Sequence, residues 1–532
     1  MSLQASGSSV FERTSLSRRT LEALTAGVTT TDGETDERET ITVEAPATGE
    51  TVGHVPSCTA DDVERAVRDA RDAQEDWERL PPTDRGAIVS RFGDLLLDHR
   101  DELLDVVQLE TGKARSDAVE ELLGLPTICA YYAATGPSLV ADESRSSVLP
   151  GVASARVTPK PVGVVGIISP WNYPLILALA DAIPALVAGT AVVCKPDPQT
   201  SFIALRLREL LIEAGMPADV LQIVTGGGET GEPLVDCVDY VTFTGSAATG
   251  RIVAAQAGRN LIDCSMELGG KNPMVVMADA DIERTVRGAI QACFNNAGQL
   301  CLAAERIYVH ESRYEEFLGA FVDATESLEL GTSFDYGPDV GSLIGETQLE
   351  TVKSHVDGAV ADGATIRTGG EPRPDVGPYC FEPTILTDLD PDATTACEET
   401  FGPVVSVWPV SDISSAIEHA NDSPYGLNAS VWTANRERGE QVAREIDCGT
   451  VCVNDGYAVC WAAIDAPMGG MGDSGIGPRN GPEGLTRYLE PKTIATSRIG
   501  PIDKPPGIPW GVYVRLMTVL ARTQRYIPAW LR

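Results

Sequence analysis

Lysine is scarce in this sequence. Of the 41 basic residues only seven are lysines and 34 are arginines, whereas 77 residues are acidic. The formal net charge of −36 argues against a nucleic-acid binder, because such proteins need a basic face against phosphate groups. The acidic residues are spread along the chain rather than gathered in one tail. This distribution favours a halophilic protein, kept soluble in concentrated salt, over an ordinary acidic cytosolic one.

Clustered metal ligands and paired cysteines are also lacking. The five histidines form no ligand group, and the H-E-x-x-H motif is absent. We therefore expect no catalytic metal. None of the twelve cysteines lies in a C-x-x-C pair, so we expect reduced thiols rather than a disulfide framework.

Long apolar runs are missing as well. The first 20 residues contain no apolar segment of the kind found in secretory signals, and the longest apolar stretch, 175–193, is interrupted by Asp181 and Pro184. We expect neither a membrane span nor secretion, and hence a cytoplasmic protein.

A length of 532 residues is enough for two to four domains. Apolar runs that alternate with helical periodicity predict two doubly wound α/β domains, because strands covered on both faces read as continuous apolar segments. The expected strands are 163–169, 191–194, 220–224, 240–243, 306–310, 429–432 and 450–453. One helix is expected to begin at Thr59. The other expected helices are 86–109, 173–186, 203–214, 314–328, 349–361 and 439–446.

These segments suggest a division of the chain. We assign 41–143 and 161–265 to a cofactor-binding domain and 266–485 to a catalytic domain. We expect 1–40 to be a mobile leader, since it has few large apolar residues. Segments 144–160 and 486–500 would form a small β extension that pairs subunits into a homodimer or homotetramer.

The final segment, 501–532, differs from the rest in charge. It contains five basic residues and a single acidic one, Asp503, with apolar and aromatic residues between them. A basic amphipathic tail can contact a membrane surface or pack on the acidic body of its own chain. We favour packing on its own chain.

Three segments carry residues suited to covalent catalysis. Cys301 follows a Gly-Gln turn, which we expect to present the thiol at a loop-to-helix junction where backbone N–H groups favour a thiolate. Glu267 precedes paired glycines and can relay a proton through water. Asn172, after a predicted buried strand, can donate its amide N–H to an oxyanion beside the Cys301 backbone N–H.

Two further segments suit a dinucleotide. Residues 243–250 form a glycine-bearing strand-to-helix turn, with Gly245, Ser246 and Gly250, that can hold a pyrophosphate. Lys195 ends a predicted strand and can hold ribose hydroxyls or a phosphate.

These segments, together with 399–404, 421–428 and 467–471, resemble the NAD(P)-dependent aldehyde dehydrogenase superfamily over about residues 40–500. The sequence as a whole is most similar to those of bacterial and archaeal enzymes called succinic-semialdehyde dehydrogenases. The resemblance implies that Cys301 attacks the aldehyde, that Asn172 holds the oxyanion, that hydride passes to the nicotinamide, and that Glu267 activates water to hydrolyse the thioester. Other residues that it places at the cofactor are Lys195, Pro170, Trp171, Gly245, Ser246, Gly250, Leu268, Glu399 and Phe401.

The sequence departs from the family in two places. Pro198 stands where NAD-preferring relatives often carry a glutamate, so we favour NADP over NAD, although the neighbouring Asp197 would repel a phosphate if it faced it. Ala180 and Asn295 stand where succinic-semialdehyde enzymes typically place arginines. The candidate pocket is apolar and suits a hydrophobic aldehyde; its residues are Leu175, Leu177, Leu300, Leu302, Tyr457 and Trp461.

Succinic semialdehyde stays the best named substrate by overall resemblance. Three alternatives are a membrane-associated dehydrogenase for medium-chain or other hydrophobic aldehydes, a CoA-acylating dehydrogenase and a non-enzymatic structural protein. Glu267 argues for hydrolysis rather than transfer to CoA, and the intact set of Cys301, Glu267 and Asn172 argues for an enzyme.

Overall fold

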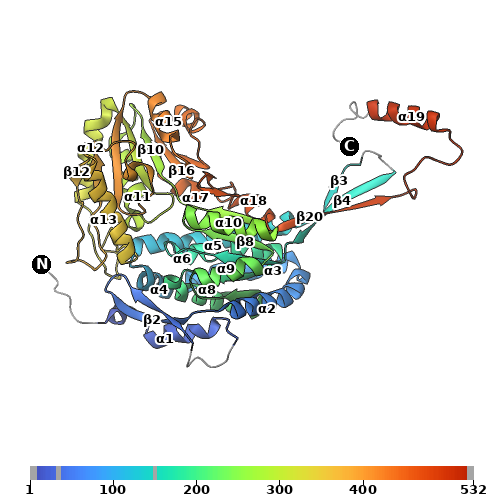
Figure 1. Ribbon diagram of the computed structural model, residues 1–532, viewed down its shortest axis with the longest axis horizontal. Coiled ribbons are helices and arrows are strands. Elements are labelled where there is room, and N and C mark those ends of the chain that lie inside the picture. The colour runs from blue at the N-terminus through green and yellow to red at the C-terminus, as the bar shows by residue number, and fades with distance from the viewer. Residues whose placement is uncertain (1–8, 32–37, 148–151, 524–532) are drawn as a thin grey trace.

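Two β-sheets organise the chain in a computed structural model that describes residues 9–31, 38–147 and 152–523 (Figure 1). The first sheet has six strands in the order β19-β9-β8-β5-β6-β7, all parallel except β19. Their bounds are β5 Val164–Ile168, β6 Ala191–Lys195, β7 Leu221–Ile223, β8 Tyr240–Thr244, β9 Asp263–Glu267 and β19 Gly475–Ile476.

The second sheet has seven strands in the order β12-β13-β14-β11-β10-β16-β17, all parallel except β12. They are β10 Asn272–Val276, β11 Ala304–His310, β12 Thr365–Thr368, β13 Thr384–Thr387, β14 Val404–Val410, β16 Asn428–Trp432 and β17 Thr450–Val453. Its main helices are α11 Ile282–Phe294, α12 Glu311–Glu326, α13 Glu346–Ala361, α15 Ile413–Asn421 and α16 Arg436–Ala443. The prediction of two doubly wound α/β domains is therefore confirmed.

The helices around the first sheet differ from the predicted ones at two breaks. Segment 86–109 lies in two helices that meet at His99, and segment 173–186 lies in two short helices separated by a turn at 178–181. Pro184 has no N–H to donate to the carbonyl of Ala180, which weakens a continuous helix there. The helices are α2 Ala60–Arg79, α3 Pro82–Asp98, α4 Arg100–Thr111, α5 Arg115–Leu139, α6 Pro174–Leu177, α7 Ala182–Ala188, α8 Ser201–Glu213, α9 Gly228–Cys237 and α10 Ala247–Asn260.

The chain returns to the first domain earlier than the predicted boundary at residue 485. After β17, Tyr457, Met468, Leu485 and Tyr488 pack in the core of the first domain, and β19 pairs with β9. This return contains α17 Ala458–Ala462, the two-residue strand β18 Met471–Gly472 and α18 Gly481–Thr486. These elements are too short and too rich in glycine to leave a periodic signal in the sequence.

The prediction of a mobile leader over 1–40 is wrong for residues 9–31. They form a 3₁₀ turn, η1 Val10–Arg13, and a helix, α1 Arg18–Leu24. Val10, Leu21 and Leu24 are buried in the first core beside β1 Thr40–Ala45 and β2 Glu50–Pro56. A few well-spaced apolar residues are enough to order this segment once a core is available. Residues 1–8 and 32–37 lie outside the described part of the chain.

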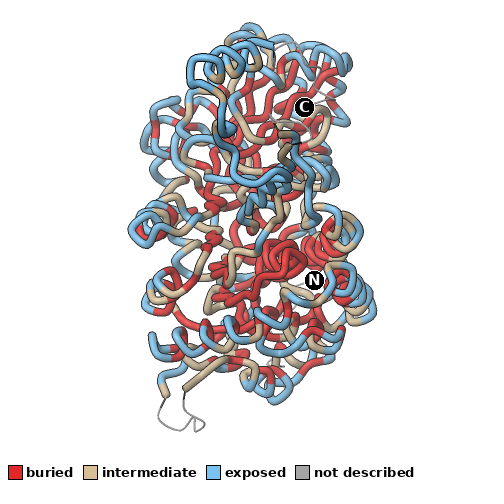
Figure 2. The backbone as a smooth tube through the Cα atoms, turned by 90° about the vertical axis from the view of Figure 1, so that its right-hand side faces the viewer, coloured by how far each residue is buried: buried red, intermediate tan, exposed pale blue. Residues whose placement is uncertain are grey.

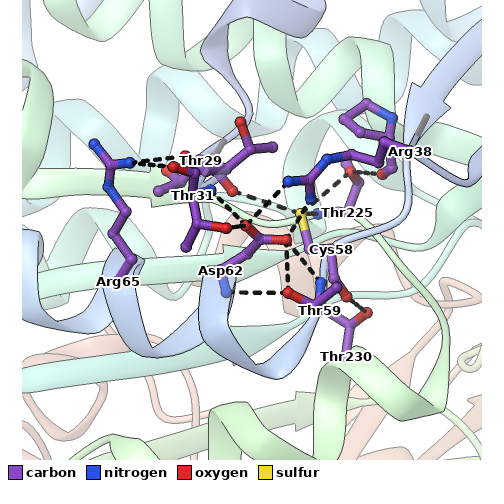
Figure 3. A network of polar contacts seen from close by, with 11 residues as sticks. Thr29, Thr31, Arg38, Cys58, Thr59, Asp62, Arg65, Thr225 and Thr230 are labelled. Atoms are coloured by element: carbon purple, nitrogen blue, oxygen red, sulfur yellow. Dashed lines mark hydrogen bonds and ion pairs between the residues drawn. The ribbon is translucent and has the colours of Figure 1, made fainter. Parts of the chain in front are cut away.

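Asp62 ties this N-terminal segment to α2 (Figure 3). Its carboxylate accepts hydrogen bonds from the backbone N–H and hydroxyl of Thr31 and forms an ion pair with Arg38. The same carboxylate accepts the backbone N–H of Thr59 at 2.8 Å, completing a capping box at the start of α2. Burial opposes ionisation of Asp62, yet these donors hold its pKa well below the usual value.

A three-stranded arm projects from the first domain. It consists of β3 Glu143–Arg145, β4 Ala153–Pro161 and β20 Leu489–Ser497, and β20 pairs antiparallel with β4 from Leu489↔Pro161 to Ser497↔Ala153. Figure 2, viewed with the arm toward the reader, shows its exposed chain in front of the buried interior. The predicted segments 144–160 and 486–500 thus meet in one sheet, apart from residues 148–151, which the structure does not describe.

Self-packing of the C-terminal tail is contradicted within the described residues. Helix α19, Trp510–Thr523, lies beyond the arm, away from the body of the chain, and none of its residues is buried (Figure 1). Trp510 is 63% exposed and Leu516 is 60% exposed. The outward course of β20 carries the tail away from the acidic surface that we expected it to cover. Within the described ranges, no helix combines the length and the apolar character that crossing a membrane requires.

Candidate active site

Cys301 lies on a loop where the two hydrophobic cores meet. Leu300 and Leu302 pack in the first core, whereas Ala297 and Ala304 pack in the second. The loop leads from the 3₁₀ turn η5, Asn295–Gly298, into β11, so the predicted loop-to-helix junction is wrong. Three successive residues with positive φ, at 53°, 53° and 70°, end the helical path before Cys301. Gly298 is required there, because a Cβ atom would lie 2.1 Å from the carbonyl oxygen of Gly402.

Asn272 fixes the backbone on both sides of the thiol. Its Nδ2 donates to the carbonyl oxygens of Cys301 at 2.7 Å and Ala303 at 2.8 Å, while its Oδ1 accepts the backbone N–H of Asn428 at 3.0 Å. Asn272 was not predicted as a site residue. Its position five residues after Glu267 was the available signal.

The surroundings of Cys301 favour the neutral thiol over the thiolate. Burial raises its pKa to about 12, and the nearby carboxylates of Glu399 and Glu267 act in the same direction. Since only the thiolate is strongly nucleophilic, the thiol needs a base to become reactive.

Glu267 lies at the end of β9 and has the properties of such a base. Burial raises its pKa to about 7, although the positive charge of Arg479 opposes the increase. Its Oε1 is buried and has no hydrogen-bond partner in the described part of the chain. A carboxyl group that titrates near neutrality beside a nucleophile can accept and return a proton.

Asn172 follows β5 and is only 4% exposed. Its side-chain Nδ2 donates to the carbonyl oxygen of Gln299 at 3.0 Å, two residues before Cys301. An amide NH₂ group has two donors, so this bond uses only one of the two N–H groups of Asn172.

A buried ion pair supports the backbone at Asn172. Lys113 Nζ pairs with Glu121 and donates to the carbonyl oxygen of Asn172 at 2.7 Å. Glu121 in turn accepts the backbone N–H of Leu175 at 2.8 Å, at the start of α6. Sequence reasoning missed both residues, since neither belongs to a recognisable motif.

The candidate cofactor residues lie along the carboxyl ends of the parallel strands of the first sheet. Pro170 and Trp171 follow β5, Lys195 ends β6, and Gly245 follows β8. In open α/β sheets this edge is the usual place for a dinucleotide.

The turn after β8 has the geometry of a phosphate site. Ser246 caps α10 by accepting the backbone N–H of Thr249 at 3.3 Å, so this helix begins directly after the carboxyl end of β8. A helix N-terminus at this position can bind a phosphate. A Cβ atom on Gly250 would lie 2.4 Å from Leu268 Cδ2, so a larger residue here would require the Leu268 side chain to move.

Lys195 and Asp197 lie at the next strand. Lys195 Nζ donates to the carbonyl oxygen of Gly226 at 2.8 Å, and burial lowers its pKa. Asp197 accepts the backbone N–H of Gln199 at 3.0 Å and so caps the turn that Pro198 begins. Its carboxylate is therefore engaged within its own turn.

Glu399 and Phe401 approach the same region from the second domain. Glu399 Oε1 accepts the backbone N–H of Gly270 at 3.0 Å, and burial, with the charge of Glu305, raises its pKa to about 8. The Phe401 ring meets Trp171 edge to face at 5.4 Å. This set, a helix N-terminus, an amine and a carboxylate spaced along one edge, fits a nicotinamide dinucleotide.

A cavity of about 240 Å³ opens beside the Cys301 loop. Of the predicted pocket residues, Leu177, Leu300, Tyr457 and Trp461 line it, as does Ala180. Leu175 and Leu302 do not line the cavity; at 0% and 1% exposure they pack in the first core.

Two charged side chains, neither predicted, also line this cavity. Arg479 donates from Nη2 to Asp181 at 2.7 Å and to Thr244 at 3.0 Å. Glu120, on α5, accepts the hydroxyl of Tyr457 at 3.0 Å and that of Tyr173 at 3.3 Å. Burial raises the pKa of Glu120 in spite of these donors. The cavity is otherwise mainly apolar and aromatic.

A thiol, a carboxyl group and a carboxamide lie close to the edge of a parallel sheet of the kind that binds dinucleotides, an arrangement typical of an oxidoreductase. The chain belongs to the aldehyde dehydrogenase family, which matches residues 33–494.

Relatives at higher and lower identity carry different substrate names. A Mycobacterium tuberculosis protein named "putative succinate-semialdehyde dehydrogenase", with NADP+ in its name, is 48% identical over 492 residues, 92% of this chain and 95% of that protein. A phenylacetaldehyde dehydrogenase from Pseudomonas fluorescens is 38% identical over 86% of this chain and 92% of that protein.

Solved structures share the fold. A betaine aldehyde dehydrogenase from Staphylococcus aureus in complex with NAD+ matches with a TM-score of 0.85 at 33% identity, over 92% of this chain and 99% of that one. The names of these relatives and neighbours include both NADP+ and NAD+, and either cofactor fits the site described above.

Proposed function

We propose that this enzyme oxidises an aldehyde to a carboxylic acid with NAD(P), through a covalent adduct on Cys301. The observation that carries the proposal is the convergence of Cys301, Glu267 and Asn172 at one loop beside an otherwise apolar cavity. A thiolate both adds to a carbonyl and leaves from an acyl group, so one residue serves both half-reactions.

The residues of the chain divide the work as follows. Glu267 takes the thiol proton, and the Cys301 sulfur adds to the aldehyde carbon. Asn172 and the Cys301 backbone N–H hold the resulting oxyanion. A bound nicotinamide would supply the hydride acceptor that converts the adduct to a thioester. Glu267 releases the thiol proton to solvent and then takes a proton from the water that attacks the thioester. The C–S bond breaks, the carboxylic acid leaves, and Glu267 returns this proton to the Cys301 sulfur, which favours hydrolysis over transfer to CoA.

We propose that NADP is preferred over NAD. Pro198 supplies no carboxylate to the ribose, and the Asp197 carboxylate accepts a hydrogen bond from the backbone N–H of Gln199 within the same turn. Lys195 remains close by as a positive partner for a phosphate. Binding titrations with the two cofactors test this preference, and tighter binding of NAD would contradict it.

Succinic semialdehyde is the first candidate substrate, on the name of the relatives at 48% identity. Its distal carboxylate needs a basic partner when it leaves water. Ala180 and Asn295 cannot supply one, and Arg479 is the basic side chain among the residues that line the cavity. We therefore assign Arg479 as the partner of that carboxylate.

An uncharged hydrophobic aldehyde is the second candidate. Glu120 faces the cavity and would repel a carboxylate, and the aromatic lining of Tyr173, Tyr457 and Trp461 suits an aliphatic or aromatic chain.

The deciding experiment follows absorbance at 340 nm in molar KCl. Succinic semialdehyde, phenylacetaldehyde and a medium-chain aliphatic aldehyde are each offered with NAD and with NADP. Cys301→Ala should abolish turnover while cofactor binding persists; retained oxidation would contradict the nucleophile. Glu120→Gln should lower KM for succinic semialdehyde alone if that compound binds with its carboxylate in the cavity. Turnover confined to the uncharged aldehydes would favour the second candidate.

We propose that the arm joins copies of the chain into a homodimer or homotetramer, and that the enzyme is cytoplasmic and halophilic. The exposed β20 edge and the extended position of the arm support the first of these. The exposed apolar and arginine residues of α19 support membrane contact or contact with a second copy. Flotation with anionic vesicles, for the full chain and for a chain lacking 501–532, separates these two, since only a membrane-binding tail would carry the full chain upward.

A further inference from the structure

Two cysteines outside the catalytic set lie in direct contact. Cys452, on β17, and Cys460, on α17, have their sulfur atoms 2.9 Å apart. A disulfide bond has a sulfur separation of about 2.05 Å, so an approach of about 0.9 Å would suffice to form one. The sequence predicts reduced thiols rather than a disulfide framework, and the cysteines of the described chain are all free.

The two thiols differ in access. Cys452 is 1% exposed, whereas Cys460 is partly exposed. The hydrogen bond from Cys452 lowers the pKa of Cys460 against the effect of burial, and the same contact raises the pKa of Cys452. Cys460 is therefore the thiol that a diffusing oxidant reaches first, and Cys452 is placed to resolve the product.

The pair borders the cavity wall. Cys460 lies within α17, whose residues Ala458, Trp461 and Ala462 line the cavity together with the preceding Tyr457. Tyr457 is held from the other side by hydrogen bonds with Glu120 and Asn295. A bond from Cys460 to β17 would attach this wall covalently to the second sheet.

We propose that Cys452 and Cys460 form a peroxide-sensitive thiol pair, and that their disulfide fixes α17 and changes aldehyde binding. A hydroperoxide oxidises the Cys460 sulfur, an S–O bond forms as the O–O bond breaks, and water or an alcohol leaves. The Cys452 sulfur then attacks the Cys460 sulfur, the S–S bond forms, and the S–O bond breaks with loss of water. The two thiols lose two electrons and two protons, which the peroxide takes up.

Peptide mapping of the full-length enzyme after hydrogen peroxide treatment tests the bond. Chymotryptic cleavage after Tyr457 separates the two cysteines, so a disulfide-linked peptide pair that dithiothreitol releases is expected. The link should persist in Cys448→Ser, a neighbouring partly exposed cysteine that serves as the matched control, and in Cys301→Ala. It should be absent from Cys460→Ser. If Cys452 and Cys460 remain open to alkylation in the treated enzyme, the proposal is overturned.

Kinetics tests the effect on the cavity. Oxidation of Cys301 reduces the number of active molecules and so lowers the maximal rate without changing KM, whereas a displaced wall changes KM. We expect KM for the aldehyde to rise by roughly three- to tenfold, because a shifted wall loses part of its van der Waals contact with the substrate. Dithiothreitol should reverse the change, and Cys460→Ser should not show it. A linked enzyme with unchanged KM would overturn the effect on binding.

The kinetic part rests on the proposed role of the cavity as the aldehyde site. Mapping does not depend on activity. A protein that forms the link but is inactive before any peroxide treatment would contradict the proposed function and still support the thiol pair.

Discussion

The Glu267 side chain is buried, and its Oε1 atom has no hydrogen-bond partner among the described residues. A buried carboxyl oxygen without a donor costs free energy, which a protein tolerates where the group has work to do. The charge of Arg479 partly offsets the effect of burial and keeps the pKa near 7 rather than higher.

The titration of Glu267 predicts the pH dependence of hydrolysis. Below pH 7 the carboxyl group is protonated and cannot accept a proton, so turnover should fall by about tenfold per pH unit on the acid side. Glu267→Gln should lower the steady-state rate by roughly 10²–10⁴ and remove this dependence. Asp263→Asn, an exposed position on the same strand, should retain the wild-type profile. A Glu267→Gln enzyme with the acid limb intact would show that another group is the base.

At the scale of elements, α5 and the residues just before it support the backbone at Asn172, the residue proposed to hold the oxyanion. Lys113 precedes this helix and Glu121 lies within it; together they reach both the carbonyl of Asn172 and the first turn of α6. Both side chains are fully buried, so each depends on the other for its charge partner.

Breaking this pair should cost stability and activity together. Glu121→Gln should lower the free energy of unfolding by about 3–5 kcal/mol, because it leaves Lys113 buried without a charged partner. Urea titration measures this loss. The double variant Lys113→Met/Glu121→Leu should recover most of the stability but little of the turnover, since Asn172 loses its support. Glu75→Gln, in an exposed pair with Arg79, should change the stability by less than about 1 kcal/mol. Full turnover in the double variant would refute the positioning role.

Continuous apolar strands were the elements best predicted from the sequence. The run at 163–169 contains β5, because a strand buried on both faces leaves an unbroken apolar signal. The break before α7 depends on Pro184, and the turn before Cys301 on the left-handed backbone at Asn296 and Ala297. Neither the break nor the turn can be predicted from the local sequence alone.

The candidate site was predictable to the extent that its residues lie in motifs. Cys301, Glu267 and Asn172 belong to recognisable segments, whereas Lys113, Glu120 and Arg479 act through contacts distant in sequence. The return of residues 457–488 to the first core was not predictable, because glycine-rich segments have no period that assigns them to a sheet.

At the scale of the whole molecule, the arm offers an edge for assembly. Nearly all of β20 is exposed, and its outer edge has no partner strand within the described chain. Deleting 489–532 should therefore reduce the mass measured by light scattering, because β4 loses its neighbour. Deleting only 501–532 is the matched control: it should lower the mass only by that of the removed residues and leave the number of chains in the assembly unchanged. An unaltered mass after the longer deletion would assign assembly to another surface.

The net charge of −36 predicts a strong response to salt. The Debye length falls from about 30 Å at 0.01 M to about 3 Å at 1 M, which removes most repulsion between surface carboxylates. We expect the thermal midpoint to rise over this range of KCl. Sucrose, which leaves charges unscreened, should not reproduce the whole gain. A midpoint that falls with KCl would contradict a halophilic protein.

The chain crosses between its domains twice, at 267–272 and again at 453–457. A single protease cut at the second crossing would leave every strand of the larger sheet in the first fragment, and all of the smaller sheet except β19. That fragment would lack Tyr457, Trp461 and Arg479, and thus one side of the cavity. Residues 457–479 therefore complete the cavity that the rest of the chain begins. Neither fragment alone would contain both Cys301 and the whole cavity wall.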